Sequence, residues 1–124
     1  MHNQPSVAEL VQAVKNFIDE TAAPNLKGHA AFHARVASNA LATVLRDLEA
    51  RIENETGEAG RLRTLLGSDS TAGLDDMNRQ LSAKIQSGEM DIATPNLLAH
   101  LKATTIAQIE VDQPTYSGLK TAKN

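Results

Sequence analysis

Apolar residues recur every three to four positions along five segments of the chain, which is the spacing of an amphipathic helix. The first segment begins after Ser6, and Glu9 stands three positions later. This pair predicts a capping box, in which each side chain accepts a hydrogen bond from the other residue's backbone N–H. We therefore expect a helix from about residue 7, followed by a connection over residues 21–28. Its apolar stripe comprises Val7, Leu10, Val11, Val14, Phe17 and Ile18.

The longest segment with helical spacing covers residues 29–54 and is expected to be the central helix of the fold. Thr56 and Gly57 are expected to end it. Phe32, Val36 and Ala40 widen its apolar arc beyond one stripe, so several helices or a partner protein must cover it. The stripe itself comprises Ala37, Leu41, Val44, Leu45, Leu48 and Ile52.

Three further helices are expected in the second half of the chain. A short one carries Leu62, Leu65 and Leu66, and residues 67–73 form a loop after it. The next helix carries Leu74, Met77, Leu81 and Ile85, and Gly88 is placed to stop it in the left-handed conformation. The last has Thr94 as N-cap, Pro95 as first residue and Pro114 as terminator.

These segments predict an all-α protein, because none alternates with the period of a strand. The expected architecture is a small helical bundle of four main helices plus one short helix, built around a long central helix. Its length of 124 residues fits one domain. We expect this domain over residues 1–113 and a polar C-terminal tail over residues 114–124.

Composition and charge exclude several classes of function. The net charge of -3 comes with scattered Lys and Arg residues, and aromatic residues make up 2% of the chain, so we expect no nucleic-acid partner. The chain has no Cys, and its first residues are polar without a signal-peptide pattern, so we expect a cytoplasmic protein. No apolar run approaches the length of a membrane span, so no membrane partner is expected.

Two histidines on the central helix are weak candidates for a metal site. His29 and His33 stand four positions apart, a spacing at which two imidazoles can bind one metal ion. The sequence supplies no obvious third ligand, so we expect no metal and no other cofactor. His33 lies beside the Ala37 and Leu41 stripe, so we expect it to pack against a neighbouring helix and to form a hydrogen bond with a loop.

No catalytic residue is expected. The adjacent carboxylates Asp19 and Glu20, and likewise Asp75 and Asp76, are expected at solvated helix ends. The glycine-containing segments lack the Gly-Lys-Ser/Thr run of a phosphate-binding loop. By itself the protein is therefore expected not to be an enzyme.

The strongest candidate site lies on the polar edge of the central helix. Arg35, Asn39 and Arg46 share this edge, and Phe32 and Val36 border it. Two guanidinium groups with an amide between them can bind carboxylates or phosphates, or anchor a protein interface. The alternative is a solvated face on which Arg46 pairs with Asp47 or Glu49.

The central helix also carries a family resemblance. The segment 32–41, FHARVASNAL, and the segment 46–49, RDLE, resemble a largely uncharacterised family of small helical domains. The likeness continues through residues 88–91, GEMD, to Gln113 and Pro114. This family occurs as free proteins or fused to kinases of the aminoglycoside-phosphotransferase type.

The resemblance implies that the protein is a noncatalytic accessory subunit of such a kinase, and that the kinase acts on hydroxyacyl-CoA in acid catabolism. The kinase would then be the protein partner. The alternative is a stand-alone helical-bundle protein that forms homo-oligomers and binds a small ligand such as an acyl-CoA between its helices.

Overall fold

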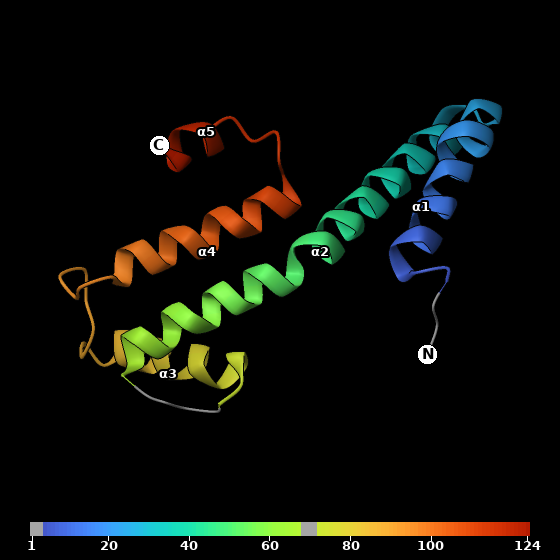
Figure 1. The fold of residues 1–124 in the computed structure, drawn as a ribbon. Coiled ribbons are helices and arrows are strands. Elements are labelled where there is room, and N and C mark those ends of the chain that lie inside the picture. The colour runs from blue at the N-terminus through green and yellow to red at the C-terminus, as the bar shows by residue number, and fades with distance from the viewer. Residues whose placement is uncertain (1–3, 68–71) are drawn as a thin grey trace. The chain divides into compact units, whose positions relative to one another are not determined.

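The computed structural model describes residues 4–67 and 72–124 as an all-α protein (Figure 1). Its α-helices are α1 (Val7–Phe17), α2 (Gly28–Leu66), α3 (Leu74–Gln86), α4 (Leu97–Asp112) and α5 (Leu119–Lys123). The two described ranges contain no strand. Four of these helices are longer, among them the long central helix α2, and α5 is short. This confirms the expected architecture. None of the helices described is both long and apolar enough to span a membrane.

The chain divides into two compact units, Met1–Ala50 and Arg51–Asn124, and the boundary falls within α2. The expectation of one domain over residues 1–113 stays a prediction. We call the two units the N-terminal hairpin and the C-terminal unit and describe each by itself.

In the N-terminal hairpin, α1 runs antiparallel to the first part of α2 (Figure 1). The capping box that starts α1 is confirmed: Ser6 N donates to Glu9 Oε2 at 2.7 Å, and Glu9 N donates to Ser6 Oγ at 3.1 Å. A π-helical turn (Ile18–Ala22) and a 3-10 turn (Ala23–Asn25) extend the helical path into the expected connection. The two helices are therefore joined by a short, mostly helical turn.

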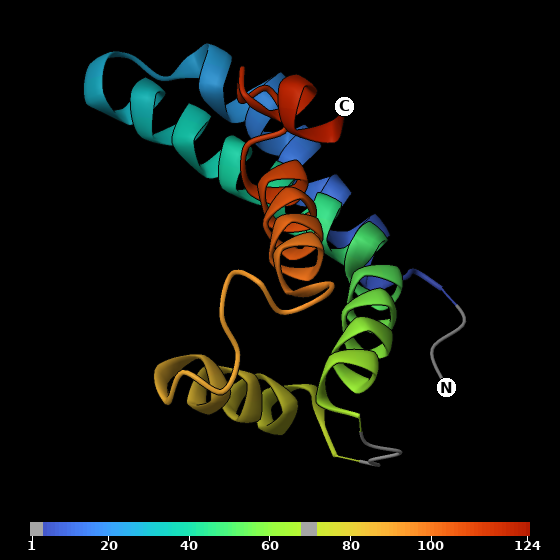
Figure 2. The same ribbon diagram turned by 90° about the vertical axis from the view of Figure 1, so that its left-hand side faces the viewer.

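In the C-terminal unit, the end of α2 packs against α3 and α4. Figure 2 shows α3 beside the last turns of α2. The apolar core of this unit comprises Leu62, Met77, Leu81 and Leu97, each at most 4% exposed. Gly88 follows the C-cap of α3 with φ 81°, as its predicted stop role requires. Burial of these four side chains stabilises the fold of the C-terminal unit.

The central helix is longer than the pattern predicted. The prediction that Thr56 and Gly57 end it is wrong, because α2 continues to Leu66 and includes the segment expected as a separate short helix. A glycine inside a helix costs about 1 kcal/mol relative to alanine. Complete burial of a leucine contributes roughly 1.5–3 kcal/mol, and Leu62 is 0% exposed. Burial of the last leucines therefore outweighs the cost of the glycine.

The start of the last long helix was also predicted wrongly. Thr94 is not its N-cap; its Oγ1 accepts a hydrogen bond from Asp91 N at 2.9 Å, and its own N–H donates to Asp91 O at 2.9 Å. This closed turn uses the groups that would have capped a helix at Pro95. The helix α4 begins instead at Leu97, after Asn96 in the left-handed conformation with φ 69°.

The ends of the remaining predicted segments are partly described. The helix α4 ends at Asp112, two residues before Pro114, as expected. Residues 114–124, expected as a polar tail, carry the short helix α5, whose Leu119 is buried. Most of the expected loop over residues 67–73 lies outside the described residues.

Candidate functional site

The predicted polar edge lies on the part of α2 that belongs to the N-terminal hairpin. Arg35 and Asn39 are exposed there, whereas Arg46 is half-buried. Arg46 Nη2 donates to Thr43 Oγ1 on the same helix at 3.1 Å. Within the described parts of the chain, the Arg35 side chain makes no hydrogen bond or ion pair. The edge therefore presents Arg35 and Asn39 to solvent, while Arg46 is held against its own helix.

The two apolar residues that border this edge are also exposed. Phe32 is 54% exposed and Val36 is 48% exposed. The Phe32 ring contacts the His33 ring edge-on, with 5.6 Å between the centroids. An aromatic ring beside an unpaired arginine has the composition of an interface anchor.

The two histidines of α2 have no metal-site neighbours among the residues that the structure describes. His29 and His33 are both exposed, so the expectation that His33 packs against another element is wrong. In the described ranges no three His, Asp or Glu side chains are grouped so that they could hold a metal ion. That the protein needs no metal stays a prediction.

The apolar stripe of α1 is exposed, although the apolar stripe of an amphipathic helix usually faces the core of a fold. Val7 is 64% exposed, Leu10 and Val14 are each 53% exposed, and Phe17 is 59% exposed. We call these four residues the α1 stripe. No apolar residue from 4 to 50 is buried. The hairpin therefore has no apolar core of its own.

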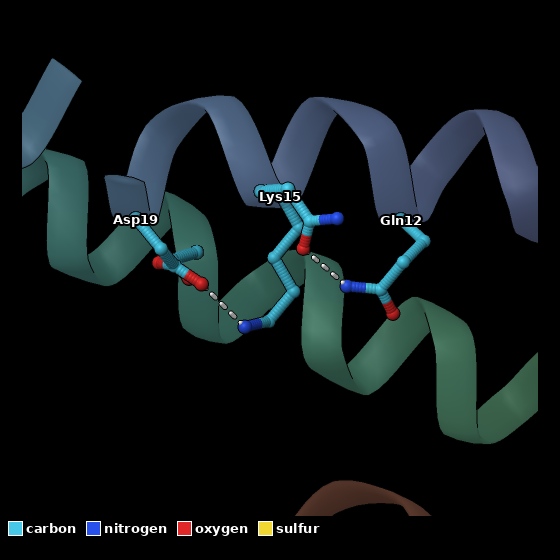
Figure 3. Close-up of polar contacts among 5 residues, drawn as sticks. Gln12, Lys15 and Asp19 are labelled. Atoms are coloured by element: carbon cyan, nitrogen blue, oxygen red, sulfur yellow. Dashed lines mark hydrogen bonds and ion pairs between the residues drawn. The ribbon is translucent and has the colours of Figure 1, made fainter. Parts of the chain in front are cut away.

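Polar contacts also join the two helices of the hairpin, beside half-buried apolar residues such as Val11 and Leu41. Lys15 and Asp19 lie along the side of α1 and the following turn that faces α2, as Figure 3 shows. Lys15 Nζ lies 2.8 Å from Asp19 Oδ2, and the buried Ser38 hydroxyl of α2 donates to the same carboxylate. The hydrogen bond from Lys15, followed by that from Ser38, lowers the pKa of Asp19 below 3.8. The hairpin is thus connected through an ionised carboxylate, and α1 turns its apolar stripe away.

The α1 stripe continues onto α2. Since a helix has 3.6 residues per turn, the α1 stripe is rotated by about a quarter-turn around the helix axis from the half-buried α1 residues that face α2. Val44 lies about a third of a turn from Ser38, in the same rotational sense. Because the two helices are antiparallel, rotations in the same sense place the α1 stripe and Val44 on the same face of the hairpin. Val44 is 43% exposed, so it extends the same apolar face.

The C-terminal unit holds a second candidate site, which the sequence did not predict. Arg61 of α2 donates from Nε to His100 Nδ1 at 3.2 Å and from Nη2 to Thr104 Oγ1 at 3.1 Å. Both acceptors lie one turn apart on α4, and His100 is 3% exposed. Burial, reinforced by the Arg61 charge and opposed by Glu58, lowers the pKa of His100. Arg61 is therefore held by two neutral acceptors.

Arg61 lines a groove of about 590 Å³ between the C-terminal part of α2, α4 and α5. A second pocket, of about 340 Å³, lies between α4 and α5. The 590 Å³ groove is lined by Glu53, Asn54, Gly57, Arg61, Ala99, Lys102, Ala103, Ile106, Ala107, Glu110, Ala122 and Lys123. We call it the Arg61 groove.

The buried histidine predicts a pH dependence of stability. The lowered pKa means that His100 holds a proton less tightly in the folded protein than in the unfolded chain, where its pKa is about 6.5. Protonation below pH 6.5 therefore favours the unfolded chain. The stabilisation is present above pH 6.5 and is lost as the pH falls through the lowered pKa of the folded state. This component of the free energy of unfolding changes by at most about 1.4 kcal/mol per pH unit.

Urea unfolding at several pH values between neutral and mildly acidic conditions measures this component. His100→Gln supplies a neutral acceptor for Arg61 that does not titrate, so its profile is expected to be flatter than that of the wild type. Identical profiles for both proteins would contradict a neutral, buried His100.

The fold and the two sites define a small helical protein whose candidate sites are an exposed apolar hairpin and an arginine-lined groove. Residues 24–116 match the family described as a domain of unknown function, DUF6285. The match covers more than half of the chain, and the protein belongs to this family. The search of curated proteins found no match, and neither did the search of solved structures.

Proposed function

We propose that this protein is a noncatalytic subunit that binds a partner protein through the N-terminal hairpin. The observation that carries the proposal is the exposed α1 stripe on a hairpin without an apolar core. Burying a Val, Leu or Phe side chain contributes roughly 1.5–3 kcal/mol, and these side chains are already about half covered. Covering the stripe would therefore contribute roughly 1 kcal/mol per residue.

We propose further that the partner is an aminoglycoside-phosphotransferase-like kinase that acts on a hydroxyacyl-CoA in acid catabolism. The resemblance of segments 32–41 and 46–49 supports this choice. The kinase would supply the ATP site, the metal and the catalytic base, and the complex would work in the cytoplasm. The exposed residues Phe32, Arg35, Val36 and Asn39 lie within segment 32–41 and are proposed as a further contact area, on another face of the hairpin than the α1 stripe.

Substitution of Arg35 tests this proposal. Arg35→Ala is expected to weaken binding of the kinase by roughly 1–4 kcal/mol, because arginines at interface centres are common anchors. The thermal midpoint of the isolated protein should change little, since the Arg35 side chain makes no polar contact within the described residues. Surface capture of the kinase and thermal melting measure the two quantities.

The control is Arg79→Ala, which removes an exposed arginine on α3 whose partner is Asp76 at 3.2 Å. It should leave kinase capture unchanged. Unchanged capture by Arg35→Ala together with a large loss of stability would show that Arg35 is part of the scaffold and not of an interface.

The second candidate function is a stand-alone protein that binds a small ligand such as an acyl-CoA. The Arg61 groove favours it, because pockets of about 300–1,000 Å³ are typical of small-molecule sites. Self-association through the α1 stripe would accompany this function. Sedimentation measures the molar mass of the isolated protein and so distinguishes a homo-oligomer from a monomeric subunit that binds a different partner.

A further inference from the structure

Arg61 has hydrogen-bond donors left over, and its Nη1 lies next to Gly57, which also lines the groove. A guanidinium group has five N–H donors, and the contacts to His100 and Thr104 use two. A Cβ atom added to Gly57 would lie 3.4 Å from Arg61 Nη1. The missing side chain of Gly57 therefore leaves space directly beside this nitrogen.

The charge of Arg61 has no carboxylate partner among residues 4–67 and 72–124. Among the described residues Arg61 forms no ion pair, and both of its acceptors are uncharged when His100 is neutral. The side chain is half-buried. A partly buried charge without a counter-charge is unfavourable, and the usual compensation is a paired anion. The groove thus offers a fixed cation to an anion that enters from solvent.

The other lining residues give the groove a definite chemistry. Lys102 adds a second cation without an ion pair within the described ranges, whereas Lys123 is paired with Glu110 at 2.5 Å. Glu53 adds one further carboxylate, so the lining keeps a net positive charge. Apart from Ile106, the apolar lining is made of small residues, which leave room for a ligand chain. These small residues are Gly57, Ala99, Ala103, Ala107 and Ala122.

We infer that the Arg61 groove binds an amphiphilic anion. Arg61 and Lys102 bind its carboxylate or phosphate group, and its aliphatic chain lies over the small residues of α2 and α4. A guanidinium held in place by two hydrogen bonds suits this task, because it can offer two parallel donors to one anion. This inference concerns the C-terminal unit alone and does not depend on whether the N-terminal hairpin binds a kinase.

Isothermal titration of the full-length protein with four probes tests the inference. Sodium octanoate and octyl phosphate carry the two anionic groups on the same chain, inorganic phosphate lacks the chain, and octyltrimethylammonium carries the opposite charge. Saturable binding of one molecule of octanoate or octyl phosphate is expected, and the tighter of the two identifies the anionic group. Inorganic phosphate should bind at least tenfold more weakly, and the ammonium probe should not bind.

Two variants remove the site in different ways. Arg61→Gln removes the cation, and Gly57→Leu fills the space beside Nη1 with a residue that favours the helix more than glycine does. Each should weaken binding of the preferred probe at least tenfold, while Arg79→Gln, on α3 outside the groove, should bind as the wild type does. If Arg61→Gln fails to fold, Gly57→Leu alone decides. Wild-type affinity in Gly57→Leu, or no saturable binding of either anion, would overturn the inference.

Discussion

Leu62→Ala is expected to lower the free energy of unfolding by about 3 kcal/mol, the largest stability effect among the substitutions considered. Leu62 is 0% exposed and packs with Met77, Leu81 and Leu97, which come from α3 and α4. Truncation of a fully buried leucine removes its transfer free energy and leaves a cavity that its neighbours fill only partly. Because α2, α3 and α4 meet at this residue, the cavity weakens the whole C-terminal unit.

Urea unfolding followed by circular dichroism measures this change. The matched control is Ile52→Ala, a truncation of similar size on the same helix at a residue that is 81% exposed. It is expected to change stability by less than about 0.5 kcal/mol. Equal losses in the two variants would mean that Leu62 is not the centre of the core.

Removal of the α1 stripe is expected to have the largest effect on partner binding. The double variant Leu10→Gln with Phe17→Gln replaces two large apolar side chains, each more than half exposed, by polar ones. Binding of the kinase should weaken about 100-fold, about 3 kcal/mol, because the lost burial of roughly 1 kcal/mol per side chain adds to the cost of placing two polar amides against an apolar partner surface. Helix content and the thermal midpoint should stay nearly unchanged, since neither side chain is buried in the isolated protein.

Surface capture of the kinase and thermal melting again measure the two effects. Gln12→Ala provides the control, because Gln12 is exposed on the same helix and bonds only to Asn16, at 2.8 Å, among the residues described. Kinase capture should be intact in this variant. A double variant that captures the kinase normally but melts early would place the stripe inside the fold and not at an interface.

Local signals in the sequence predicted the fold well. The capping box of Ser6 and Glu9 and the stop at Gly88 both involve residues a few positions apart, and the structure confirms both. The end of α2 was missed because the cost of Gly57 is local, whereas the burial of Leu62 depends on residues of α3 and α4. The start of α4 was missed because Asp91 competes for the capping groups of Thr94.

The candidate sites were less predictable. Periodicity identified the α1 stripe but could not show that the described residues leave it about half exposed. The Arg61 groove was missed altogether, because Arg61 and His100 are 39 residues apart and neither stands in a recognisable motif. The one local hint is the spacing of His100 and Thr104, which places both on one face of a helix. Contacts of this kind depend on the packing of α2 against α4.

We propose that the N-terminal hairpin binds a kinase of the aminoglycoside-phosphotransferase type. The most direct measurement is the molar mass, by light scattering during gel filtration, of an equimolar mixture of this protein with such a kinase from the same genome. One species with the summed mass is expected, together with a faster transfer of phosphate to hydroxyacyl-CoA than by the kinase alone. Two separate species and an unchanged kinase rate would contradict it.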